Sequence, residues 1–541
     1  MAPCPAITRR RKSMVVPAVK AAKETCPLLT FDLPYVTFYY NQKVLLYKVG
    51  AEEGEFEKAV ESLEKSLAEV LGYFYPLAGK LVQDEEGVLQ VDCNDRGAEF
   101  VVSAAEDVHL SELAASDASP LLQDIVPYAG VQNHEGRELP LLAVQASPAI
   151  PLPPNVLPSY SEGVPRHRSN EFCSVCLRDT RSLCSGTQKY HWRSSLFHLN
   201  RKTTMKKLKL RTLKPPSTAT IVAELGPLLM AAIDCRHLKV TKLKDGMALG
   251  CSFNHVILDG NSTWHFMSSW AELARGLTTI SLLPFHDRTK ARNTRLKLDL
   301  PPLTAHIANG DGPAHQNGEV KPPSKPMREK IFHFSEEVLD KIKAQVNAHL
   351  EPDQKPFSSF QALGVHVWRS VIRARELPPE SYTVFTLFVD CRKRLEPPMS
   401  DNYFGNLIQG IYTVTASGML LAQPAEYGAG LLHQLINSHN AAAIDAKSTE
   451  WEKAPKLYNY KDAGINCVAV GSSPRFKVYE VDFGWGSPDS VRSGSNNKFD
   501  GMMYLYAGKE GGRSVDAEIT LEAETMKKLE ADEQFLTGCA V

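Results

Sequence analysis

The chain is organised around MALGCSFNHVILDG, residues 247–260. Its first seven residues place large apolar side chains at every second position, which predicts a strand. Beyond residue 260, apolar side chains recur at steps of four, three and four (Phe266, Trp270, Leu273 and Leu277), which predicts a helix, and we expect Asn261 to cap it. His255 therefore leaves the end of a strand just before a helix, and loop positions on such rigid scaffolds often carry catalytic side chains.

The spacing of His255 and Asp259 allows two interpretations. A neutral imidazole is the usual general base near pH 7 and contributes roughly 10²–10⁴-fold in rate, while an aspartate four residues later could orient the loop. Alternatively, His255 is a buried, hydrogen-bonded histidine and Asp259 closes a turn. So short a pattern often arises by chance, so the pattern alone favours the second interpretation.

Three more segments change that balance: Tyr75–Leu81 (YPLAGKL), Tyr403–Asn406 (YFGN) and Asp482–Gly486 (DFGWG). Together with the HxxxDG pattern they resemble the signatures of the BAHD family, plant acyltransferases that use acyl-coenzyme A. The four segments stand in the family's order, and the resemblance covers nearly the whole chain. Within the family, the sequence is most similar to the subgroup linked to cuticle formation.

The resemblance implies an α/β fold of two similar domains like chloramphenicol acetyltransferase, each a mixed sheet flanked by helices, with a channel at their interface. It makes His255 the general base and pairs Asp259 with Arg392 across the domains. Residues expected to support the site structurally are Asp259, Gly260, Arg392, Asp482, Gly484 and Gly486. Acyl-CoA is expected as a co-substrate and not as a bound cofactor, with no metal and no acyl-enzyme. No motif singles out residues that bind CoA.

The sequence indicates less about the acceptor substrate than about the acyl donor. Family members that use shikimate carry Thr-x-Trp ahead of DFGWG, where this sequence has Gly471 and Ser473, which argues against shikimate. Asn254 replaces the first histidine of the relatives' HHxxxDG. Fatty or ω-hydroxy-acyl chemistry for cutin, within plant specialised metabolism, is the interpretation we carry forward. The alternative is a catalytically inactive homologue that binds acyl-CoA or a partner.

Composition sets broad limits. The chain has 541 residues, 43% hydrophobic and 23% charged, and a net charge of −1, which gives no global indication of nucleic acid or membrane binding. No apolar run reaches the roughly 18–20 residues of a membrane span. Arg9–Lys12 is not followed by an apolar core, so no secretory signal is expected. Eleven cysteines without paired spacing then favour a reduced, cytoplasmic protein, which we expect to be a monomer.

We expect an N-terminal tail over residues 1–30, an N-terminal acyltransferase domain over 31–283, a crossover linker over 284–326 and a C-terminal acyltransferase domain over 327–541. Residues 31–40, which are rich in β-branched and aromatic side chains, predict a strand, as do residues 478–481. Apolar residues at helical spacing from Phe56 to Leu71 predict an amphipathic helix.

Residues 146–239 are an atypical insert within the first domain. They hold 15 basic and 5 acidic residues without a regular apolar period. Three explanations compete: a nucleic-acid-binding insert, a metal site using Cys173, Cys176 and Cys184, or a retained intron. Joining Gln145 to Val240 gives the unbroken strand and turn LLAVQVTKLKDG, so we favour the intron and expect these two residues to lie close together.

Overall fold

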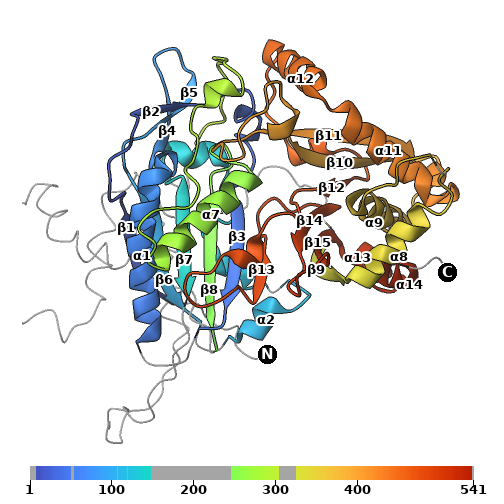
Figure 1. Ribbon diagram of the computed structural model, residues 1–541, viewed down its shortest axis with the longest axis horizontal. Coiled ribbons are helices and arrows are strands. Elements are labelled where there is room, and N and C mark those ends of the chain that lie inside the picture. The colour runs from blue at the N-terminus through green and yellow to red at the C-terminus, as the bar shows by residue number, and fades with distance from the viewer. Residues whose placement is uncertain are drawn as a thin grey trace, which may run out of the picture. The chain divides into compact units, whose positions relative to one another are not determined.

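Two mixed sheets organise the computed structural model, which describes residues 8–49, 54–105, 108–118, 120–147, 245–303, 325–351 and 353–538 (Figure 1). All of these residues belong to one compact unit. Each sheet has six strands and contains both parallel and antiparallel neighbours. This confirms the expected α/β class with two sheet-containing domains.

The first sheet has the order β1-β6-β7-β8-β3-β13. Only β6 and β7 run parallel. Its strands are β1 (Thr8–Val15), β6 (Ala98–Ala104), β7 (Leu142–Ser147), β8 (Met247–Phe253), β3 (Asn41–Tyr47) and β13 (Ser490–Arg492). Strand β13 comes from the C-terminal half of the chain and pairs with β3, so the two halves share this sheet.

Successive side chains of β3 point to opposite faces of the first sheet and pack in two different hydrophobic cores. Leu45 and Tyr47 join the core that contains helices α1 (Glu55–Tyr73) and α7 (Gly260–Ala274), whereas Val44 and Leu46 pack with the short helices α2 (Leu110–Ala114) and α3 (Leu122–Ile125). In Figure 1, α1 and α7 lie across the strands of this sheet.

The second sheet has the order β11-β10-β12-β14-β15-β9. Its strands are β11 (Ile408–Ala416), β10 (Tyr382–Asp390), β12 (Val468–Val470), β14 (Met502–Ala507), β15 (Val515–Glu522) and β9 (Met327–Phe334). Around Trp368, its core takes in residues of α8 (Glu336–Val346), α9 (Ser359–Arg375), α10 (Ser417–Ala422), α11 (Ala425–Ser438), α13 (Ala523–Glu530) and α14 (Glu533–Thr537). The remaining α-helix of the described residues is α12 (Ala441–Lys453). Their remaining strands are β2 (Thr25–Pro27), β5 (Leu89–Asp92) and β4 (Lys80–Gln83), which form a small third sheet.

Several local predictions were wrong. Residues 31–40 form no strand: Leu33–Tyr35 is a 3-10 turn with Pro34 in it, and the strand starts at Asn41, because proline cannot donate to a strand ladder. Val478–Glu480 is also a 3-10 turn. Within the expected N-terminal tail, Thr8–Val15 forms β1, paired antiparallel with β6.

The first two residues of the segment assigned to the insert, Ala146 and Ser147, belong to strand β7, so the predicted boundary at Ala146 does not coincide with the end of the strand. Strand β7 pairs antiparallel with β8, and its last residue, Ser147, lies opposite Ala248. The expected closeness of Gln145 and Val240 concerns a residue, Val240, that lies outside the described residues, as do the three cysteines of the metal hypothesis.

Candidate active site

The loop that carries His255 is tied to the end of β8 by its own backbone and by Asn133. Asn254 is fully buried, and its side-chain amide donates to the Asn133 carbonyl at 2.7 Å and accepts from the Val256 amide at 3.2 Å. The His255 amide donates to the Asn133 side chain at 2.9 Å. The asparagine that replaces the relatives' first histidine therefore has a clear structural role.

The His255 ring lies on the ring of Tyr35, with centroids 5.1 Å apart and planes 25° from parallel. Its Nδ1 atom is buried and has no hydrogen-bond partner among the described residues. Burial lowers the pKa of His255 and outweighs the hydrogen bond to its own backbone and the charge of Asp259, which both raise it; the charge of Lys43 lowers it further. The imidazole is therefore neutral at pH 7, as a general base must be.

Asp259 and Arg392 form the expected ion pair. Arg392 Nη1 donates to Asp259 Oδ2 at 2.8 Å and Nη2 donates to Oδ1 at 3.1 Å, and both side chains are almost completely buried. Burial alone would raise the pKa of Asp259, but the charge of Arg392 and its hydrogen bonds outweigh burial and lower it. The two-point contact fixes the direction of the carboxylate.

Asp259 also starts the helix. Its carboxylate accepts from the Ser262 amide at 3.0 Å and caps α7, so the prediction of Asn261 as the cap was wrong. The second carboxylate oxygen accepts from the Leu407 amide at 3.0 Å. Asp259 holds the loop through four hydrogen bonds: Oδ1 accepts from Arg392 and Ser262, and Oδ2 accepts from Arg392 and Leu407.

The YFGN segment lies beneath this loop. Ser262 Oγ contacts the carbonyls of Tyr403 and Gly405 at 3.2 and 3.0 Å, and the Asn406 side chain donates to the His255 carbonyl at 2.8 Å. Segments from both halves of the chain therefore fix the position of the His255 backbone by hydrogen bonds.

Sequence reasoning missed a second buried ion pair. Arg288 Nη1 donates to Asp32 Oδ1 at 2.7 Å, and Arg288 Nη2 donates to the Ile257 carbonyl within the loop. Asn406 donates to the same Asp32 oxygen. Arg288 was assigned to the crossover linker and Asp32 to a strand, and no local pattern distinguishes either residue.

Gly260 fits its expected supporting role. A Cβ atom at this position would lie 2.9 Å from two ring carbons of Phe476, so any side chain there would displace that ring. The glycine is required by close packing at the first turn of α7.

The DFGWG segment is structural and lies at the far end of α7. Asp482 Oδ1 accepts from the amides of Gly484 and Gly486, and both glycines have positive φ. Phe483 packs on Trp270, and Arg275, which follows α7, donates to the Asp482 carbonyl. The helix of 15 residues spans about 22 Å, so Asp482 is distant from His255.

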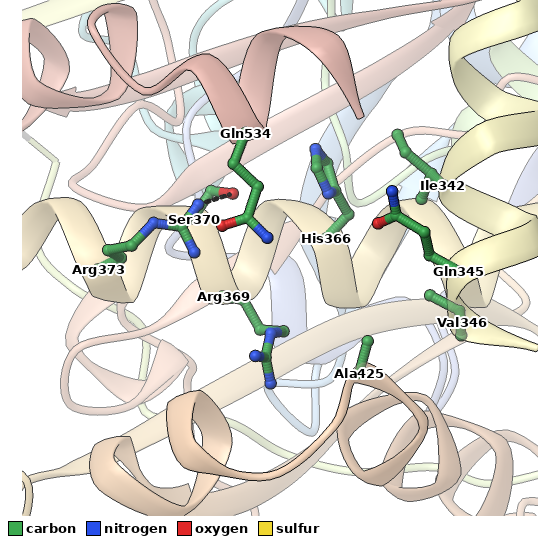
Figure 2. Close-up of a pocket in the computed structure, with 9 residues that line it drawn as sticks. All are labelled: Ile342, Gln345, Val346, His366, Arg369, Ser370, Arg373, Ala425 and Gln534. Carbon is green, nitrogen blue, oxygen red and sulfur yellow. Dashed lines mark hydrogen bonds between the residues drawn. The ribbon is translucent and has the colours of Figure 1, made fainter. Parts of the chain in front are cut away.

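Two hollows lie away from the His255 loop. Figure 2 shows the smaller one, of about 30 Å³, between α8, α9, α11 and α14, where Arg373 donates to Ser370. Its volume suits roughly one water molecule. The larger, of about 520 Å³, is lined by residues of both halves, among them Asp117, Arg328 and Lys498.

The family model described as Transferase family matches residues 6–148 and 208–536. A relative named as a BAHD acyltransferase is also 45% identical to this chain over 95% of its length. The chain belongs to the BAHD family. Residues 149–207 lie outside the match, inside the segment assigned to the insert.

Curated relatives agree with the BAHD assignment. BAHD acyltransferase DCR of Arabidopsis thaliana is 45% identical over 527 residues, which cover 95% of this chain and 89% of the relative. The Hydroxycinnamoyl-CoA:5-hydroxyanthranilate N-hydroxycinnamoyltransferase HHT4 of Avena sativa is 26% identical over 97% of this chain and 98% of its own. This BAHD protein is therefore an acyl-CoA-dependent acyltransferase.

Solved structures share the fold. Vinorine synthase has a TM-score of 0.59 at 17% identity, covering 97% of this chain and 96% of its own. TRI101 of F. sporotrichioides, solved with coenzyme A and T-2, has a TM-score of 0.59 at 17% identity, covering 95% and 98%. Among the described residues of the BAHD chain, we find no helix whose length and apolarity would let it cross a membrane.

Proposed function

We propose that His255 is the general base in the transfer of the acyl group from acyl-CoA to a hydroxyl or amine. The imidazole removes the proton of the acceptor as its oxygen or nitrogen attacks the thioester carbonyl. The tetrahedral intermediate then collapses, the carbon–sulfur bond breaks, and the imidazolium returns the proton to the CoA thiolate. No acyl-enzyme is formed, so no serine or cysteine nucleophile is needed.

One observation carries this proposal: Asp259 holds the loop that carries His255 and forms no hydrogen bond with the imidazole. Asp259 accepts hydrogen bonds from Arg392, Ser262 and Leu407, and none from His255. Since Nδ1 is buried, Nε2 is the nitrogen that we assign to the substrate. A fixed, neutral base costs little reorganisation during the reaction.

The test is CoA release from purified protein across a panel of acyl-CoA donors and alcohol or amine acceptors. His255→Ala should lower kcat by about 10²–10⁴-fold, with a smaller effect on acyl-CoA affinity, since the base acts in the transition state. His349→Ala, an exposed histidine, is the matched control and should behave like the wild type. Near-normal turnover by His255→Ala would rule out the mechanism, and no CoA release by the wild type would favour the inactive, ligand-binding homologue.

For the acyl group we propose fatty or ω-hydroxy-acyl chemistry in cutin formation, on the basis of the resemblance to the cuticle-linked subgroup. We also propose a channel between the halves, reaching His255 from both sides. The five described cysteines are unpaired thiols, which supports our proposal that the protein is cytoplasmic. We also propose that it is a monomer.

Shikimate should be a poor acceptor. A Cβ atom at Gly471 would collide with the Met502 side chain and lie 3.0 Å from the Tyr504 ring, so the threonine of shikimate-using relatives does not fit here without rearrangement. We expect p-coumaroyl-CoA with shikimate to give lower kcat/KM than the best acceptor in the panel. Equal turnover of shikimate and that acceptor would reverse the assignment.

A further inference from the structure

Two buried polar atoms beside the His255 loop have no hydrogen-bond partner among the described residues. They are the imidazole Nδ1 of His255 and the side-chain oxygen Oδ1 of Asn406, the last residue of the YFGN segment. The two atoms belong to neighbouring groups, because Asn406 Nδ2 donates to the His255 carbonyl at 2.8 Å. A buried polar atom without a partner costs free energy, so a role for this pair of atoms has to be considered.

The orientation of the Asn406 amide follows from its neighbours. Besides the His255 carbonyl, Nδ2 contacts Asp32 Oδ1 at 3.3 Å, and that carboxylate is paired with Arg288. Both neighbouring oxygens can only accept, so exchanging the amide nitrogen and oxygen would set acceptor against acceptor in both contacts. The Asn406 backbone amide also donates to Asp32 Oδ1, at 3.2 Å, which holds the residue in place. The free atom of the side chain is therefore an oxygen that can accept one more hydrogen bond.

Tyr35 sets the plane of the His255 ring but does not determine which edge of the ring carries Nδ1. A 180° flip of the imidazole exchanges Nδ1 with a C–H group and preserves the stack with Tyr35. An amide oxygen at this edge favours an N–H over a C–H group. It also favours the tautomer with its hydrogen on Nδ1, which leaves the lone pair on Nε2. The base then presents Nε2 to the acceptor substrate, as the proposed acyl transfer requires.

A neutral acceptor suits a general base better than a charged one. Burial lowers the pKa of His255, and the Asn406 side chain is among the groups that raise it in part. An amide oxygen thus favours the imidazolium that forms during proton transfer and still leaves the resting imidazole neutral. A carboxylate in its place would pair with the imidazolium and raise the pKa of His255 more strongly.

We propose that Asn406 is a positioning residue for the base: its amide oxygen accepts from Nδ1–H of His255 and holds the ring with Nε2 towards the substrate. The inference rests on the proposed acyl transfer at His255. As the proton of the acceptor moves to Nε2, Nδ1 keeps its own hydrogen, and its hydrogen bond to Asn406 becomes charge-assisted. When Nε2 gives the proton to the CoA thiolate, that bond returns to its neutral form. Asn406 itself exchanges no proton.

The test measures kcat and kcat/KM against pH for the wild type and two variants, with one acyl-CoA and one uncharged alcohol. Asn406→Leu removes the acceptor at similar volume. Its kcat should fall by about 10- to 100-fold with a smaller change in KM, and the midpoint of the acid limb should move to lower pH by about one pH unit, because the imidazolium loses a hydrogen bond. Asn406→Asp keeps an acceptor oxygen, so its midpoint should lie at or above that of the wild type.

The midpoint of the acid limb does not depend on how much of the protein is folded, so it separates positioning from lost stability. Asn496→Leu is the matched control, since Asn496 is also buried and its amide donates to the carbonyls of Tyr40 and Tyr128. This change should lower the Tm, as Asn406→Leu does, but leave the midpoint where the wild type has it.

Nitrogen-15 NMR of protein labelled at histidine provides a readout that needs no Asn406 variant. The signals of His255 are identified by their loss in His255→Ala. Above the acid limb they should show the hydrogen on Nδ1 and none on Nε2. A hydrogen on Nε2 would overturn the inference, even if Asn406→Leu does not fold.

The kinetic outcomes separate this inference from the proposed function. A midpoint that Asn406→Leu leaves unchanged, or that Asn406→Asp and Asn496→Leu lower equally, would overturn the inference. If the wild type then turns over normally and His255→Ala does not, only the inference fails. No CoA release by the wild type from any pair would overturn the proposed function as well.

Discussion

Protonating His255 costs more free energy than protonating an exposed histidine. Its ring stacks on Tyr35, its Nδ1 is buried, and burial together with the charge of Lys43 lowers its pKa. A base whose pKa lies below the working pH is already deprotonated when the substrate arrives. The acid limit of activity should therefore reflect this one residue.

The dependence of kcat/KM on pH tests this. A lowered pKa means that the neutral imidazole persists below the ordinary value of about 6.5, so activity should fall with decreasing pH only below about 6.5. The unfolded chain binds the proton more readily than the folded one, so protonating His255 also removes stability as the pH falls below that value. A midpoint above 7 for the acid limb would show that His255 is not the group that limits the reaction.

At the scale of elements, the site is a strand–loop–helix unit fastened from the other half of the chain. The bidentate pair of Asp259 and Arg392 joins residues 133 positions apart, and Asp32 with Arg288 fastens the same loop from a second direction. Each carboxylate is buried with its guanidinium, so removing one partner strands the other charge.

A double-mutant cycle on Asp259→Ala and Arg392→Ala tests the first pair. Each single change should destabilise the protein by about 3–5 kcal/mol and reduce activity, and the double change should cost less than the sum, because it leaves no charge stranded. Denaturant unfolding and kcat measure the two effects.

The control cycle uses Lys393 and Asp401, an ion pair at 2.8 Å whose side chains are 66% and 70% exposed. Exposed pairs couple weakly, so its two changes should add within about 0.5 kcal/mol. Additive losses at Asp259 and Arg392 would instead show that the buried pair does not fix the loop as proposed.

In the whole molecule, β13 from the C-terminal half joins the first sheet, and residues of both halves hold the His255 loop. Residues 146–239 separate β7 from β8 along the chain, except that Ala146 and Ser147 themselves belong to β7. We propose that this segment is no part of the working fold. If Gln145 were joined to Val240, Val240 would take the place of Ala146 opposite Leu249, and residues 243–246 would remain for the turn. The described register therefore accepts the junction without a gap.

Deleting residues 146–239 should give a protein with an equal or higher Tm and unchanged kcat/KM, because the hairpin closes with a short loop and its strand faces are preserved. Deleting 149–207, the part outside the family match, is the comparison and should be less stable, since it leaves a longer loop to close between β7 and β8. Loss of folding in the longer deletion alone would place the boundary at 149–207. Transcript reads that join the codons of Gln145 and Val240 would support the intron.

The sequence by itself determined the strand of residues 247–253, the helix after it, the position of His255 between them and, through the family motifs, the pairing of Asp259 with Arg392. Periodicity encodes these elements because each must bury one face, and a motif preserves a spacing along the chain. The meeting of Asp32, Arg288 and Tyr35 at the same loop is visible only in the tertiary structure. These residues look ordinary in their local sequence, since the partner that gives each its role is hundreds of positions away. Burial and charge pairing depend on that spatial neighbourhood, which no local pattern records.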